Sequence, residues 1–141
     1  MKHYEISRTV PVAREKLWAV LADPQQLTSA HLGILRIEGN IGPGQRIRLW
    51  FEASPQRPFS LKVSEWVEGE RMVWSGGMPL GLFRGVRQFN LRPKGGGTEF
   101  HMREDFSGLM LPLIWKSMPD LNPSFEKFAA GLERAACGAT E

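Results

Sequence analysis

The sequence predicts an α+β domain, in which one antiparallel sheet has a long C-terminal helix covering one face. Between residues 33 and 106 apolar and polar side chains alternate with a period of two, which indicates a run of strands. Short glycine- and proline-rich breaks separate these strands, as in consecutive hairpins. The last third of the chain carries one apolar stripe at helical spacing, and a sheet with one apolar face needs such a cover.

The N-terminal segment is β-like up to Val10 and ends at Pro11. Residues 12–24 place Leu17, Trp18 and Leu21 on one helical stripe, so we expect Trp18 to pack in the core rather than to contact a ligand. The helix should end at Asp23, because a residue that precedes proline disfavours the helical conformation. A short second helix is expected over 24–30.

The alternating segments predict strands over 34–39, 46–52, 59–65, 71–75, 83–92 and 98–106. The connections are expected to be a turn at 40–44, a loop at 54–58, a tight turn at 68–70, a flexible apolar loop at 76–82 and a glycine-rich turn at 93–97. Trp50 falls on the opposite face from Leu49 and Phe51, which predicts an outward position, while Trp66 is ambiguous.

After Gly108 the chain becomes helical, with the undisturbed helix expected over 123–136. Its apolar stripe consists of Leu121, Phe125, Phe128 and Leu132. Residues 78–82 are either a mobile lid over a pocket or a loop packed on the terminal helix. Residues 109–115 could line the same mouth, form a dimer contact or touch a membrane surface.

Composition limits the classes of function. A chain of 141 residues with 42% hydrophobic content is one ordinary domain, here residues 1–141. The net charge of +3 is dispersed, without the clustered basic footprint of nucleic-acid binding. Cys137 is the only cysteine, and the chain has neither a secretory h-region nor an apolar run long enough to span a bilayer. We therefore expect a cytoplasmic protein without a transmembrane segment.

The usual reactive constellations are not found in the sequence. His3, His31 and His101 do not have metal-ligand spacing, and Cys137 has no evident base nearby. The glycines at 39–44 lie between two strands rather than between a strand and a helix, which argues against a dinucleotide-binding turn. Neither a metal nor a cofactor is expected.

One carboxylate stands out because it interrupts an apolar face. Thr98, Phe100, Met102, Glu104 and Phe106 share one side of their strand. In the preceding strand the matching face consists of Gly85, Arg87, Phe89 and Leu91. The apolar faces of the two strands coincide only in registers where the residue numbers of cross-strand partners add up to an odd number. A sum of 191 places Arg87 opposite Glu104, and a sum of 189 places Arg87 one diagonal away from Glu104.

An inward carboxylate is costly unless it is paired, and Arg87 is the expected partner. Three interpretations remain open. The pair could be a structural clamp between strands, a polar anchor for a mostly apolar ligand, or an acid–base site in which Glu104 acts on a ligand carbonyl or enol while Arg87 stabilises an oxyanion.

The order and spacing of these segments resemble the START-like, or SRPBCC, superfamily with its helix-grip fold, most closely its polyketide cyclase/dehydrase-like subgroup. The resemblance covers nearly the whole chain. It rests on the strand ending at Pro11, the helix with Leu17-Trp18 and Leu21, the Asp23-Pro24 stop, the glycine-rich turn before Arg46, Phe89-Asn90-Leu91, Gly97-Thr98, Glu104 before Phe106-Ser107-Gly108, and the terminal helix.

The resemblance implies a curved antiparallel sheet of about six to seven strands around the C-terminal helix, two short helices after the first strand, and a cavity between sheet and helix. Its members bind lipids, polyketides or other apolar molecules, which implies a small hydrophobic ligand here. The alternatives are a cyclase, dehydrase or aromatase that uses Glu104 and Arg87, and a co-chaperone-like interaction module; a homodimer is possible. The expected ligand-binding residues are Phe51, Phe59, Leu61, Glu65, Met72, Trp74, Arg87, Phe89, Phe100, Met102, Glu104, Phe125 and Phe128.

Overall fold

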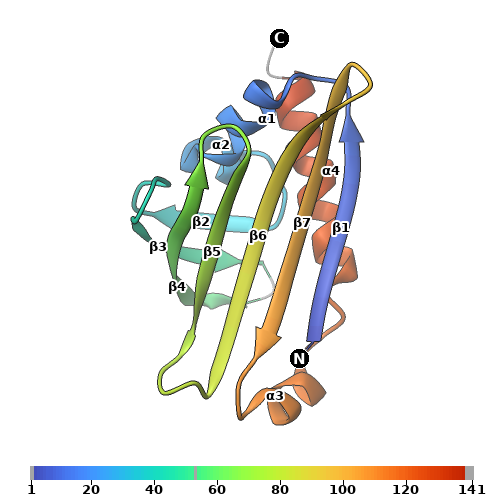
Figure 1. Ribbon diagram of the computed structural model, residues 1–141. Helices are drawn as coiled ribbons and strands as arrows, with labels where there is room; N and C mark the ends of the chain where they lie inside the picture. The colour runs from blue at the N-terminus through green and yellow to red at the C-terminus, as the bar shows by residue number, and fades with distance from the viewer. Residues whose placement is uncertain (1, 53, 139–141) are drawn as a thin grey trace.

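A seven-stranded antiparallel sheet in the order β1-β7-β6-β5-β4-β3-β2 curves around the C-terminal helix α4 (Figure 1). The computed structural model describes residues 2–52 and 54–138. This arrangement confirms the predicted helix-grip architecture. Its elements are β1 (Lys2–Val10), α1 (Arg14–Leu21), α2 (Pro24–Ser29), β2 (Ile34–Glu38), β3 (Arg46–Phe51), β4 (Ser54–Val67), β5 (Arg71–Met78), β6 (Phe83–Lys94), β7 (Gly97–Ser107), α3 (Leu111–Ser117) and α4 (Asn122–Gly138).

The two short helices form where the sequence predicts them. Pro24 lies in the first turn of α2, and the Asp23 side chain accepts a hydrogen bond from the Gln25 backbone N–H at 2.9 Å. Trp18 is buried in the core and contacts the ring of Trp66 edge-on at 5.0 Å, as expected for a packing residue. Within residues 2–52 and 54–138, no helix is both long and apolar enough to cross a membrane.

The hairpin of β6 and β7 adopts the register in which paired positions sum to 191. Arg87 lies directly opposite Glu104, and the neighbouring rung on the inner face pairs Phe89 with Met102. On the outer face, the His101 side chain forms a hydrogen bond with Glu5 of β1, with 2.8 Å between Nε2 and Oε2. Trp50 also lies outside, where the guanidinium carbons of Arg36 and Arg48 are 5.1 and 5.2 Å from its ring centre.

Glu65 corrects the expectation that simple alternation continues through β4. Its backbone has a φ of 49°, and the register between β4 and β5 shifts between Ser64 and Val67. Because this bulge adds a residue to one strand, the Glu65 side chain turns to solvent, where it binds Arg71 at 2.8 Å. Trp66 instead packs, partly buried, against the core.

Two segments predicted as loops belong to strands. Residues 54–58 form the start of β4, which bulges there: Ser54 lies opposite Phe51 and Phe59 opposite Leu49. Residues 76–78 continue β5, and glycine is required because a Cβ on Gly76 would lie 2.4 Å from the Ser60 carbonyl oxygen. These glycines allow neighbouring strands to approach closely, rather than making a loop mobile.

From Phe128 onward, α4 packs in the core. Phe128 stacks on Phe100 at 6.3 Å, and Leu132 and Ala136 are almost completely buried. Gly131 faces the segment after α2, where an added Cβ would lie 2.5 Å from the Leu32 Cβ and 3.1 Å from the Ala30 carbonyl oxygen. The absence of a side chain at position 131 therefore sets how closely α4 approaches the domain.

We predict that Gly131→Ala lowers the free energy of unfolding by about 1–3 kcal/mol, because the close backbone and side-chain neighbours cannot yield without repacking. The matched control is Gly138→Ala in the same helix, where an added Cβ meets nothing within 4 Å. That change should be neutral or slightly stabilising. Urea unfolding of both variants checks this, and an equal effect would contradict the packing role of Gly131.

Candidate functional site

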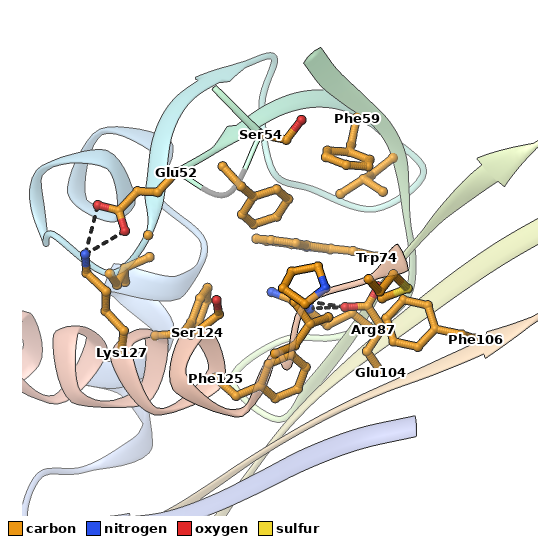
Figure 2. Close-up of a pocket in the computed structure, with 18 of the residues that line it drawn as sticks. Glu52, Ser54, Phe59, Trp74, Arg87, Glu104, Phe106, Ser124, Phe125 and Lys127 are labelled. Carbon is orange, nitrogen blue, oxygen red and sulfur yellow. Dashed lines mark hydrogen bonds and ion pairs between the residues drawn. The ribbon is translucent and has the colours of Figure 1, made fainter. Parts of the chain in front are cut away.

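A partly open cavity of about 370 Å³ lies between the inner face of the sheet, the N-terminal half of α4 and α3 (Figure 2). Most of its wall is apolar, including Phe51, Phe59, Leu61, Trp74 and Phe125. This volume is within the range of pockets that hold small molecules, roughly 300–1,000 Å³. The cavity is therefore large enough for a ligand.

The Arg87–Glu104 ion pair is a polar site on this mainly apolar wall. Glu104 Oε1 accepts from Arg87 Nε at 2.8 Å and lies 2.7 Å from Nη2. The side chains are only 13% and 17% exposed. Both contacts use Oε1, so neither of them engages the second carboxylate oxygen or the guanidinium Nη1.

Aromatic rings hold the Arg87 guanidinium in place. Its central carbon lies 4.9 Å from the ring centre of Phe125, 5.6 Å from that of Phe51 and 5.8 Å from that of Phe128. These distances are typical of cation–π contacts. The arginine thus joins β6 and β7 to β3 and α4, four elements that surround the cavity.

Gly85 makes room for the carboxylate. A Cβ at this position would lie 2.8 Å from Glu104 Oε2, so a side chain would displace that oxygen. Gly85 lies one inward position before Arg87 on β6, and its cross-strand partner is Phe106. The strand therefore has a glycine where the second carboxylate oxygen needs space.

A second ion pair lies on another side of the cavity (Figure 2). Lys127 Nζ of α4 contacts the two carboxylate oxygens of Glu52 at 2.6 and 2.8 Å. Both side chains are about half exposed, and Ser54 and Ser124 complete the polar lining. Each charged group on the wall thus has a partner of opposite charge.

The structure brings eight of the thirteen residues expected to bind a ligand to the cavity wall: Phe51, Phe59, Leu61, Trp74, Arg87, Glu104, Phe125 and Phe128. Four others face inward but do not line the cavity, because they are fully buried in the core: Met72, Phe89, Phe100 and Met102. Glu65, the remaining one, lies on the outside. Alternation identifies the inner face but not the depth at which a core ends and a cavity begins.

Some lining residues were missed by the sequence-based selection. Phe106 and Leu121 could be predicted from the sequence, since both lie on the apolar stripes of their strand and helix. No sequence pattern predicts Met118 and Pro119 as lining residues, because their positions depend on how the chain turns between α3 and α4. Residues 78–82 do not line the cavity; this loop instead bonds to the segment before α3 through Met110 N–H and the Leu82 carbonyl, at 2.8 Å.

The outer face of the sheet carries ordinary surface polar pairs. The hydrogen bond from His101 lowers the pKa of the Glu5 carboxyl, and the nearby charges of His101 and Arg103 act in the same direction. Among the described residues, no three His, Cys, Asp or Glu side chains converge as a metal site would require.

A curled sheet closed by a C-terminal helix, with an apolar cavity between them, defines a helix-grip protein of the SRPBCC superfamily. Residues 1–137 match the family described as polyketide cyclase/dehydrase and lipid transport. The chain belongs to this family. None of the curated proteins matches it.

Solved structures share the fold across the whole chain. Protein MLL2253 from Mesorhizobium loti has a TM-score of 0.76 at 16% identity, and the match covers 99% of each chain. TTHA0849 from Thermus thermophilus has a TM-score of 0.75 at 19% identity, covering 99% of this chain and 100% of the other. NE0264 from Nitrosomonas europaea has a TM-score of 0.76 at 14% identity, with 98% and 96% covered. At these identities the likeness concerns the fold.

We predict that Arg87→Met lowers the free energy of unfolding by about 3 kcal/mol, because it leaves a largely buried carboxylate without its partner. The double variant Arg87→Met with Glu104→Leu should recover most of this loss. Chemical denaturation of the double-mutant cycle measures the coupling.

The control is Arg92→Met on the outer face, where the arginine side chain is 75% exposed and Glu99 keeps Lys94 as a second partner at 3.5 Å. This change should alter stability by less than about 1 kcal/mol. Equal effects of Arg87→Met and Arg92→Met would mean that the inward pair is no more important to the fold than a surface pair.

Proposed function

We propose that this protein binds one small, uncharged, largely apolar molecule that carries a hydroxyl, carbonyl or N–H group. The observation that carries the proposal is a cavity of about 370 Å³ whose apolar wall contains the self-neutralised Arg87–Glu104 pair. The apolar body of the ligand would contact the rings around the cavity, and its polar group would meet this pair.

The charge balance of the wall favours an uncharged ligand. Arg87 is neutralised by Glu104, and Lys127 by Glu52. A carboxylate or ammonium group that entered the cavity would lose its hydration without gaining an unpaired opposite charge. A hydroxyl or N–H can donate to Glu104 Oε2, and a carbonyl can accept from Arg87 Nη1, without disturbing the existing bonds.

The family description supports this class of ligand. Polyketides and lipids are mainly apolar molecules with few polar groups, which is the chemistry that this wall suits. The surrounding core is closely packed, so the cavity is a local feature of one half of the molecule rather than a general looseness.

Two fluorescent probes with one aromatic framework test the proposal. N-phenylnaphthylamine is uncharged, whereas anilinonaphthalene sulfonate adds an anionic group. We expect the uncharged probe to bind at least about tenfold more tightly, a difference of about 1.4 kcal/mol. Fluorescence titration measures both constants; failure of both to bind would contradict a ligand cavity, and preference for the sulfonate would contradict the charge argument.

We predict that Glu104→Gln narrows or reverses the preference for the uncharged probe over the sulfonate. The substitution leaves the positive charge of Arg87 without its counter-ion inside the cavity. The matched control is Glu99→Gln, which releases Arg92 on the outer face and should leave both affinities unchanged. The same titrations provide the measurement. An unchanged selectivity in Glu104→Gln would mean that the bound probe does not meet this pair.

Ser124→Trp identifies where the probe binds. Ser124 lines the cavity from an exposed position on α4, so a tryptophan can fill the space with little effect on the core. We expect this variant to lose binding of N-phenylnaphthylamine while its thermal unfolding stays close to that of the wild type. Retained binding would place the probe elsewhere on the protein.

A further inference from the structure

We propose that one end of the molecule docks on the surface of an anionic lipid bilayer. This end, the apolar tip, consists of Met78, Leu80, Leu109 and Leu113, all with exposed side chains. Figure 1 shows α3 at the same end as the loop between β5 and β6 and the N-terminus. Docking there is independent of whether the cavity binds a ligand.

Backbone hydrogen bonds join the two segments of the apolar tip into one surface. Leu109 N–H donates to the Gly81 carbonyl at 3.2 Å, and Met110 N–H donates to the Leu82 carbonyl at 2.8 Å. Leu80 is 91% exposed and Leu109 is 82% exposed. Leucines on adjoining loops expose apolar area that does not contribute to the core.

Besides its exposed side chain, Leu80 has a backbone conformation that is unfavourable for the isolated protein. Its backbone has a φ of 62°, a left-handed conformation that glycine and asparagine adopt much more readily than leucine. Folding therefore gains nothing from a leucine at this position, either by burial or by conformation. A surface that takes the side chain out of water would give it a role.

Charge identifies the partner as an anionic surface. Lys2 and Arg84 lie at the last rungs of the sheet before the tip, opposite Phe106 and Ser107, and Lys116 lies on α3. All three are exposed, and none forms an ion pair within the described part of the chain. Segments 76–86 and 106–119 contain no Asp or Glu. Basic residues around inserted apolar side chains are the pattern that binds anionic lipid headgroups.

The same charges argue against a second copy of this chain as the partner. A symmetric dimer through the apolar tip would bring together two sets of lysine and arginine side chains without intervening carboxylates. A bilayer has no such conflict. Because Phe83 and Ile114 line the cavity from the same two segments, docking would also bring the cavity close to the lipid.

Flotation of the purified chain with lipid vesicles tests the proposal. We expect the protein to bind phosphatidylcholine vesicles that contain about one third phosphatidylglycerol, to bind pure phosphatidylcholine much less, and to dissociate as the salt concentration rises. No partition onto the anionic vesicles, or equal partition onto both kinds, would overturn the proposal.

Two variants with matched controls locate the contact. Leu80→Asn should reduce partition about tenfold, with thermal stability unchanged or raised because asparagine tolerates the left-handed backbone. Lys116→Glu should reduce partition about fivefold or more. The controls are Leu35→Asn on β2, where the leucine is 51% exposed, and Lys16→Glu on α1 at the other end of the molecule; both should bind as the wild type does.

Wild-type partition by Leu80→Asn would overturn the proposal. So would a wild-type dimer in sedimentation that Leu80→Asn dissociates, because the tip would then be a protein interface. Binding of N-phenylnaphthylamine by Leu80→Asn, measured in parallel, reports on the cavity alone, so the two proposals can fail separately.

Discussion

The Arg87–Glu104 rung divides the interior of this protein into a filled half and a hollow half. On one side of it, the inward rungs of β6 and β7 carry Phe89, Met102 and Phe100, which are completely buried. On the other side lies the rung of Gly85 and Phe106, and Phe106 lines the cavity. Complete burial of a charged pair among apolar side chains is costly, and the closely packed core ends at this rung.

The same boundary crosses α4. Leu132 and Ala136 pack in the core, whereas Leu121, Ser124 and Phe125 line the cavity; Phe128 lies between the two groups and contacts both Phe100 and the Arg87 guanidinium. Gly131 brings the core-facing half of the helix close to the segment after α2. The helix is thus fixed firmly at one end, and its other end forms a wall of the cavity.

Much of this arrangement is predictable from local pattern. Alternation identifies the inner face of each strand, the odd-sum rule restricts the partners of Glu104 to two choices, and the stripe of α4 includes Phe125 and Phe128. The failures have distinct physical causes. Glu65 is turned outward by a bulge, and Gly76 serves close strand packing rather than flexibility. Met72 and Met102 are buried in the core rather than on the cavity wall because of their place in the folded domain, which the alternation of apolar residues does not reveal.

Three features at the hollow end are unfavourable for stability. The charged rung, the empty space beside it and an exposed leucine with a left-handed backbone lie there, while the aromatic and aliphatic core fills the opposite half. Replacement of an inward ion pair by apolar residues is often neutral or stabilising, so stability alone does not account for Arg87 and Glu104. Their presence is explained if the pair keeps the wall polar at one point and the space beside it open. The packed half then supplies the stability that allows the other half to keep a charged pair beside an open cavity.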